Sequence, residues 1–444
     1  MPDKHTDAKV NSLQTVGRSI TDWLRIATTI PSQLSPLKRG QSRAPLGPTQ
    51  RGQSTMIGMV FVIVIVLGVF VFAQTTLAPQ ARNNAEIQHN TQVVLDFQAI
   101  HGDTLTGAAS GERGTSALQM GREYPNPIIY VHPPDPAGAL RTGSEQDVQL
   151  TGIKAVNSET ADYLNGSDVE YDHQPLRYSP VYNEFRTAGD SVIEHGTYYQ
   201  DYDGSTEIVG TTNLIEGNTI RLTATTGDTS TTTQQGRLVE TVPLSGDEQT
   251  VIVEDTGSNP EIQLETNLDA ATWETMLEDE VDPSAVNLNN DRYVVDVRSG
   301  SGDTVIIELE AGATYELSTA KLHHKTSAQP AAPKSEVPTV AYLTTNDATN
   351  ATVQSGSTKQ FTIDVRDSFN NPKANVPLDV QTVRPSSDAE LVTRVSRTDG
   401  TVTVVYTAPS TSPPPDDELR VCVESCGAAS LSNEDVVIFD ITIS

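Results

Sequence analysis

An uncharged apolar run, Met56 to Ala73, limits what this chain can fold into more than any other feature of its sequence. Its eighteen residues carry no charge and no strong hydrogen-bonding side chain. As a helix they span about 27 Å, close to the ~30 Å hydrocarbon core of a bilayer. Only a helix satisfies the backbone hydrogen bonds of a single segment in lipid. The run therefore predicts one membrane-spanning helix.

Charge is distributed unevenly on the two sides of this run. Residues 1–52 hold eight basic and three acidic side chains, a net charge of +5, and the remaining residues hold 21 and 55, a net charge of −34. Because basic flanks stay on the cytoplasmic side, we expect a cytoplasmic N-terminus and extracellular C-terminal domains in the cell membrane. An exterior this acidic repels nucleic acid and excludes that class of partner. It predicts the surface of a halophile, with an ordinary acidic secreted protein as the alternative.

The residues before the apolar run read Arg51-Gly52-Gln53-Ser54. Next to an apolar helix, this tetrapeptide resembles the class III signal peptide of archaeal type IV pilins and archaellins. The resemblance covers roughly residues 51 to 100. It implies cleavage between Gly52 and Gln53 by a prepilin peptidase, a helix retained as membrane anchor and assembly element, and other pilin-like subunits as partners. The chain departs from many pilins in lacking a glutamate early in this helix.

Two other interpretations of the N-terminus stay open. In the first, the apolar run is an uncleaved anchor and Met1 is the first residue of the mature protein. In the second, it is a secretory signal that is cut after Val71-Phe72-Ala73, so that the mature protein begins at Gln74.

One helical element is predicted over residues 53–105, behind a cytoplasmic leader of residues 1–52. Its second half is amphipathic, with an apolar stripe that includes Val94 and Phe97. Pro79 lies between the halves and should kink the helix. In the leader, apolar residues at helical spacing between Leu13 and Ile30 predict a short amphipathic helix.

A β-rich extracellular domain is predicted for residues 106–320. One helix interrupts it, with Asp269 as its N-cap and Trp273 in the core. Short alternating or apolar runs between turn residues predict strands at Thr219–Thr225, Leu238–Leu244, Thr250–Glu254, Glu261–Glu265, Arg292–Val297, Thr304–Leu309 and Thr314–Leu317.

Residues 321–338, K-L-H-H-K-T-S-A-Q-P-A-A-P-K-S-E-V-P, have the composition of a flexible linker. His323 and His324 lie in it without a cysteine or carboxylate paired with them locally, so the segment predicts no metal site. Asp201-Tyr202-Asp203-Gly204 has the first residues of a calcium loop but lacks the later ligands, which favours an acidic turn.

The last predicted domain, residues 339–444, contains two turn motifs with strand-like flanks. Asn370-Asn371-Pro372 follows an alternating run, and Thr398-Asp399-Gly400 precedes a strand that closes on Thr407-Ala408-Pro409. These motifs resemble the bacterial immunoglobulin-like (Ig-like) domains of invasins and intimins. The resemblance implies a β-sandwich that serves as a spacer or an adhesive end.

Four residues are candidates for covalent modification in an extracellular domain. Cys422 and Cys426 are the chain's two cysteines, and their spacing predicts a disulfide across a tight turn, with free thiols as the alternative. Asn165 and Asn350 begin N-glycosylation sequons.

No catalytic, nucleotide-binding or metal-binding motif was found, so we expect no enzyme activity, no cofactor and no metal. The predicted fold is mainly β, with an N-terminal transmembrane or pilin-type helix, a β-rich ectodomain and a C-terminal Ig-like sandwich. The expected function is that of a pilin-like cell-surface protein, a minor subunit or an adhesin for attachment or cell contact. The alternative is a membrane-tethered extracellular enzyme or solute-binding protein with its site in residues 115–320.

Overall fold

The structure of this chain is a computed structural model, and the chain divides into two compact units, residues 1–68 and 69–444. The described residues are 51–125, 131–156, 161–164, 168–246, 249–281, 292–384, 387–410, 416–427 and 435–444. They are mainly β, with a long helix at their N-terminal end, which confirms the predicted fold class. The predicted amphipathic helix of the leader lies outside the described residues.

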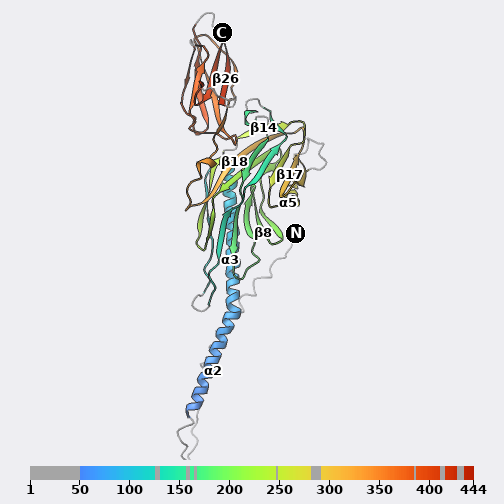
Figure 1. Ribbon diagram of the computed structural model, residues 1–444, viewed down its shortest axis with the longest axis vertical. Helices are drawn as coiled ribbons and strands as arrows, with labels where there is room; N and C mark the ends of the chain where they lie inside the picture. Colours follow the sequence, from blue (N-terminus) through green and yellow to red (C-terminus); the bar gives the residue numbers. More distant parts are fainter. Residues whose placement is uncertain are drawn as a thin grey trace, which may run out of the picture. The chain divides into compact units, whose positions relative to one another are not determined.

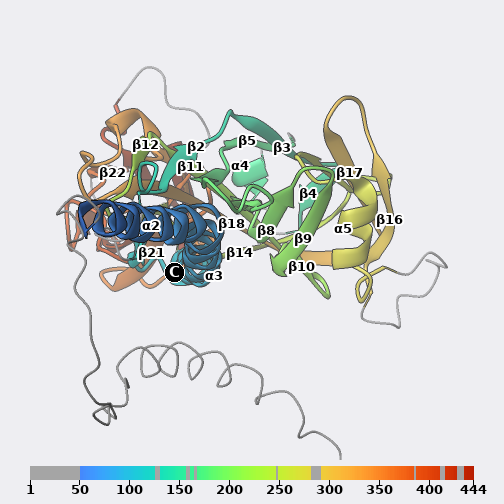
Figure 2. The same cartoon turned by 90° about the horizontal axis from the view of Figure 1, so that it is seen from below.

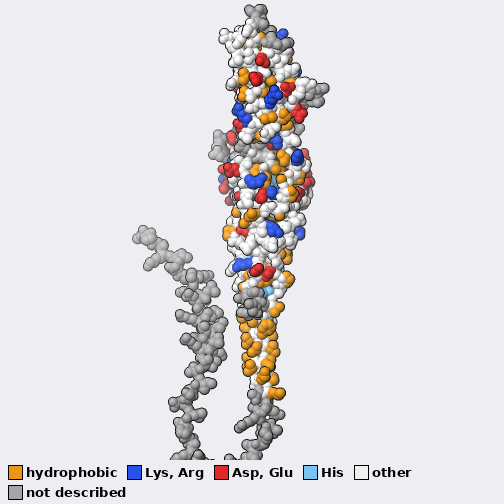
Figure 3. Space-filling view, turned by 90° about the vertical axis from the view of Figure 1, so that its left-hand side faces the viewer, with side chains coloured by type: hydrophobic (Ala, Val, Ile, Leu, Met, Phe, Trp, Pro, Cys, Tyr) orange, Lys and Arg blue, Asp and Glu red, His pale blue; other side chains and the backbone are white. Residues whose placement is uncertain are grey.

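The apolar run forms helix α2, Arg51–Phe72. Every large hydrophobic side chain from Met56 to Phe72 is exposed, by 48 to 75%, and Figure 3 shows them as a continuous apolar surface. Within the described residues, the stretch Met56–Ser110 is the one helix long and apolar enough to cross a membrane.

Helical hydrogen bonding changes immediately before Pro79. Residues Ala73–Leu77 form a π-turn, η1, in which the Ala78 N–H donates to the carbonyl of Ala73. Proline has no N–H to continue the ordinary ladder, and π-turns accommodate such breaks. The disturbance expected at Pro79 therefore lies in the turn that precedes it.

Helix α3 follows as Ala78–Ser110 and ends five residues beyond the predicted limit of 105. Gly111 caps it in the left-handed region, with φ at 66°, and donates to the carbonyl of Gly107. Val93, Phe97 and Ile100 of α3 are fully buried in one hydrophobic core. This core holds α3 along the strands of the following domain, the head (Figure 1).

Three sheets make up the described part of the head. The first runs β1 (Gly114–Leu118), β13 (Arg237–Ser245), β18 (Thr314–Thr326), β11 (Thr219–Gly227), β10 (Ile215–Glu216), with β14 (Thr250–Asp255) also paired to β18 and β4 (Ile153–Ala155) to β14. The second runs β12 (Ser230–Thr233), β2 (Ala137–Thr142), β6 (Leu176–Val181), β7 (Asp190–Glu194), β8 (Thr197–Tyr202), β9 (Ser205–Gly210). The third runs β16 (Val294–Ser299), β17 (Thr304–Leu309), β15 (Glu261–Glu265), β3 (Gln146–Thr151), β5 (Val169–His173).

The predicted helix within the head is α5, Ala270–Met276. Asp269 caps it by accepting a hydrogen bond from the backbone N of Thr272, and Trp273 is fully buried, as expected. A second short helix, α4, spans Ala161–Leu164. Figures 1 and 2 both place α5 and β17 on the side of the head away from α3, and Figure 2 shows β16 beside them.

All seven strands predicted for the head are present, but the predicted linker begins too early. Strand β18 runs to Thr326, so residues 321–326 belong to the first sheet and not to a linker. Here β18 pairs with β11 on one edge and β13 on the other. The polar composition does not predict a strand here, because threonines of the neighbouring strands bond one ring nitrogen of each histidine. Thr226 bonds His323 Nδ1 at 3.1 Å, and Thr241 bonds His324 Nδ1 at 3.2 Å.

The C-terminal domain is a β-sandwich, as its turn motifs predicted. One sheet runs β19 (Val340–Thr344), β21 (Thr358–Asp367), β24 (Thr401–Thr407), β23 (Asp388–Leu391). The other runs β20 (Asn350–Val353), β26 (Val436–Ile443), β25 (Asp417–Val423), β22 (Leu378–Thr382). Their inner faces share a core in which the rings of Phe361 and Phe439 lie 4.2 Å apart. We call this domain the Ig-like module.

Candidate functional site

The candidate site lies where the Ig-like module meets the head, at the turn after β21. Asp367 organises this turn because its Oδ1 accepts from the backbone N of Phe369 at 2.9 Å and of Asn371 at 3.2 Å. Asn370 between them adopts a left-handed backbone, with φ at 59°, which asparagine tolerates better than most residues. The sequence Asp-Ser-Phe-Asn-Asn is thus a rigid turn that presents side chains to the head.

Buried polar contacts join this turn to two head strands, at the end of β13 and in the middle of β18. Asn371 Nδ2 donates to Ser245 Oγ at 2.8 Å and to the carbonyl of Thr319 at 2.7 Å. Ser245 Oγ donates to Asp367 Oδ1 at 3.1 Å, and Thr319 Oγ1 donates to the carbonyl of Phe369 at 2.7 Å. Buried hydrogen bonds of this kind are costly to leave unmade, so they fix the module in one orientation. Burial also raises the pKa of Asp367.

Aromatic rings surround the polar contacts. Tyr171 of β5 packs against Phe369 at 5.7 Å between ring centroids, and Tyr163 of α4 packs against Tyr342 of β19 at 6.1 Å. The Tyr163 hydroxyl also bonds Thr319 Oγ1 at 3.0 Å. The junction therefore combines apolar and polar contacts from α4, β5, β13, β18, β19 and the turn after β21.

The segment between β18 and β19 is held at several points, which corrects the prediction of a flexible linker. Gln329 Nε2 donates to the carbonyl of Asp228 at 2.9 Å. Lys321 forms an ion pair with Glu336 at 3.0 Å, next to the short 3₁₀ helix η2, Lys334–Glu336. Its prolines make the segment extended, but these contacts to the head keep it in place.

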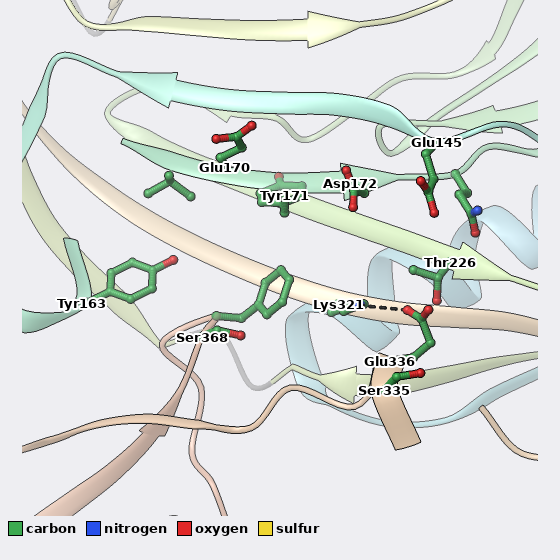
Figure 4. Close-up of a pocket in the computed structure, with 13 residues that line it drawn as sticks. Glu145, Tyr163, Glu170, Tyr171, Asp172, Thr226, Lys321, Ser335, Glu336 and Ser368 are labelled. Carbon is green, nitrogen blue, oxygen red and sulfur yellow. Dashed lines mark ion pairs between the residues drawn. The ribbon is translucent and has the colours of Figure 1, made fainter. Parts of the chain in front are cut away.

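A polar cavity of about 350 Å³ lies at this junction (Figure 4), and we call it the junction cavity. Its walls come mainly from β5, the middle of β18, η2 and the turn of the Ig-like module. The ionisable lining residues are Glu145, Glu170, Asp172, Glu336 and Lys321. Since Lys321 pairs with Glu336, three carboxylates stay without a counter-charge from the lining.

The sequence-predicted site residues are not brought together at this cavity. Gly52 and Gln53 lie in α2, and Asn165 lies outside the described residues. Asn350 is exposed at the start of β20, with Thr352 of its sequon also exposed. Cys422 and Cys426 form a disulfide at the end of β25.

Among the residues that the structure describes, no group of three or more His, Cys, Asp or Glu side chains is placed to hold a metal ion. The acidic stretch Asp201 to Gly204 is the hairpin turn between β8 and β9, with φ of Gly204 at 88°. Arg177 neutralises Asp201 at 2.8 Å. The turn interpretation of that stretch is confirmed.

A second cluster of ionisable groups is fully enclosed in the head. The rings of His173 and His195 stack at 4.1 Å between centroids, and the backbone N–H of His195 donates to His173 Nε2. Glu194 beside them accepts from Tyr199, from Asn267 and, through Oε1, from Gln146 Nε2. All three ionisable side chains are buried, so no substrate reaches them and the cluster is structural.

Buried neutral histidines predict acid sensitivity of the head. Burial lowers the pKa of His324 to about 4, with a smaller contribution from His323, and it lowers the pKa of His173 well below its ordinary 6.5. The unfolded chain therefore binds more protons than the folded one between pH 6.5 and 4, and stability is lost as pH falls through that range. His324 alone contributes about 3 kcal/mol over it.

The variant His324→Gln tests this expectation because its amide can keep a bond to Thr241 while it cannot titrate. Urea unfolding between pH 7 and 4 should show a weaker pH dependence for the variant, by about one proton. Identical pH profiles for the two proteins would exclude His324 as a source of acid sensitivity.

No family model matches the sequence, and no curated protein matches it. Among solved structures, domains 4 and 5 of the S-layer protein SbsC align at 8% identity over 31% of this chain and 63% of that one, with a TM-score of 0.20. The Yersinia pseudotuberculosis adhesin InvE aligns at 12% identity over 44% and 54%, with a TM-score of 0.18. The D00-D0 domain of intimin aligns at 15% identity over 43% and 92%, with a TM-score of 0.20. This chain spans less than two thirds of the S-layer and adhesin chains that it matches.

Proposed function

We propose that this protein is a membrane-anchored, pilin-like cell-surface protein that presents its Ig-like module for attachment or cell contact. The observation that carries the proposal is the combination, in one chain, of an exposed apolar helix and an Ig-like module fixed by buried contacts. The helix supplies an anchor in a single membrane. The junction attaches the module rigidly to the head, because Asp367 and Asn371 form buried hydrogen bonds with head residues.

The pilin-like part of the proposal rests on Arg51-Gly52-Gln53-Ser54 in front of the apolar run. We expect the mature protein to begin at Gln53, after cleavage by a prepilin peptidase. N-terminal mass spectrometry of membrane-extracted protein checks this expectation. A first residue of Met1 would indicate an uncleaved anchor, and Gln74 would indicate a secretory signal.

Attachment is tested by removing the Ig-like module. Deletion of residues 339–444 should leave the protein in the membrane and abolish most of its contribution to attachment of cells to surfaces or to one another. Retained attachment together with loss of turnover of an external substrate would favour the enzyme hypothesis instead.

A control variant distinguishes loss of the module from loss of its rigid attachment to the head. Asp367→Ala with Asn371→Ala removes the junction bonds to Ser245 and Thr319 while keeping the module. If rigid presentation matters, this variant attaches less well than the unmodified protein but better than the deletion.

The acidic exterior fits a role outside the cell in strong brine, and neither a cofactor nor an enzyme activity is part of this proposal. The second candidate function is solute binding in the ectodomain. One observation favours it, the junction cavity with its carboxylates and aromatic rings. Pockets of this volume accept small ligands or short peptide segments.

A further inference from the structure

The junction cavity runs along the free edge of a β-strand. Four consecutive residues of β5, Val169 to Asp172, line it. Successive residues of a strand point to opposite faces of the sheet, so only an edge presents four in a row to one cavity. In the described part of the chain, β5 pairs with β3 alone and is the last strand of its sheet. Figure 4 shows Glu170, Tyr171 and Asp172 on this strand, above Lys321, Ser335 and Glu336.

The free edge of β5 has a defined end. Just after β5, the backbone of Gln174 lies against β11, and its N–H donates to the carbonyl of Thr225 at 2.7 Å. The edge before this contact is about 13 Å long for four residues, which is the length of a short added strand. Unpaired backbone groups on such an edge are a template for another extended segment.

The charge of the cavity selects the kind of segment. Glu145, Glu170 and Asp172 are exposed, and no described Lys or Arg forms an ion pair with them. The Glu170 carboxylate accepts from the neutral amide of Gln149 at 3.2 Å, which leaves its charge uncompensated. A segment with basic side chains supplies the missing charge. The rings of Tyr171 and Phe369, which also line the cavity, attract cations through their faces.

A second copy of this chain is a poor occupant because its extracellular part carries a net charge of −34. We propose that the junction cavity binds an extended lysine- or arginine-bearing segment of a partner protein, which adds as a strand to the free edge of β5. The inference rests on the proposed surface role only in that the cavity must face a partner outside the cell. Because Phe369 belongs to the Ig-like module, the bound segment contacts both the head and the module.

Binding is tested with the full-length protein in detergent micelles and a fluorescein-labelled octapeptide of alternating lysine and threonine. Fluorescence anisotropy at low salt should show saturable binding, and the same peptide with glutamine in place of lysine should bind at least tenfold more weakly. Absence of binding by the lysine peptide overturns the proposal. So does displacement by free spermidine at equal concentration, which would indicate a site for small cations.

The position of the site is tested by the double variant Glu170→Gln with Asp172→Asn. Removing two exposed charges should weaken binding of the lysine peptide about tenfold. The matched control is Glu274→Gln with Glu278→Gln, which removes two exposed carboxylates at α5 and should leave affinity unchanged. Equal affinities for the two double variants overturn the assignment to β5.

Strand addition is tested by two octapeptides that are N-methylated at alternate backbone amides in opposite registers. An added strand uses the N–H groups of one register only, so one peptide should bind at least tenfold more weakly than the other. Equal affinity, whether retained in both or lost in both, excludes strand addition. Membrane retention and attachment are measured separately, so failure of these binding tests is distinguishable from failure of the proposed surface role.

Discussion

Replacing Val62 and Val66 together by lysine will release most of the protein from membranes. Both residues lie near the middle of the apolar run and are exposed by about 60%. A lysine at the centre of a membrane helix costs about 2.5–3.5 kcal/mol, so two of them cost about 6 kcal/mol and shift the partition by roughly four powers of ten. Alkaline carbonate extraction of isolated membranes measures the retained fraction.

A matched control has the same substitutions at the same spacing outside the apolar run. Gln80→Lys with Asn84→Lys places two lysines on exposed positions of α3. We expect this variant to be retained in the membrane as well as the unmodified protein. Equal retention of both double variants would contradict membrane insertion of α2.

Replacing Glu86 by glutamine will destabilise the attachment of α3 to the head. Glu86 is fully buried, and its carboxylate accepts from the backbone N of Asn183, Glu184 and Phe185 and from the Tyr124 hydroxyl. A glutamine side chain turns one of the two acceptors into a donor and leaves N–H groups unpaired. The expected loss is about 3 kcal/mol of unfolding free energy, since each buried unsatisfied group costs about 1–3 kcal/mol.

Urea unfolding monitored by tryptophan fluorescence and circular dichroism measures this loss. Glu112→Gln makes the same change just after the end of α3, where the side chain is exposed, and should alter stability by less than about 0.5 kcal/mol. Equal midpoints for the two variants would show that the buried carboxylate contributes nothing to folding.

The parts of the fold that the sequence predicts are those with a strong local signal. The apolar helix, the capped helix at Asp269 and the alternating strand at Phe361 to Val365 are visible in composition and periodicity alone. The strands between Ala137 and Gly210 were missed. Several of them, such as β8 with T-Y-Y-Q-D-Y, bury polar and aromatic residues in succession and show no alternation.

The junction could not be predicted because its partners are distant in sequence. Ser245 and Asn371 are separated by 126 residues, and neither has a local feature that indicates the other. The junction cavity had one weak signal, the alternation of acids in V-E-Y-D-H over β5. That pattern indicates an exposed strand, but the free edge follows only from the sheet order. Residues 321–326 show the converse case. Their polar composition predicts a linker, but pairing with β11 and β13 makes them part of a strand.

The central position of β18 has a consequence for how the head forms. Its thirteen residues pair with β11 along one edge and with β13 and β14 along the other. Each of those strands precedes β18 by many tens of residues, so the first sheet cannot close until the chain has been synthesised as far as Thr326. Sheets that depend on such distant pairing fold slowly, and their open edges are prone to aggregate in the meantime. The slow step in forming the head is therefore the pairing of β18, which brings together strands that lie far apart in the sequence.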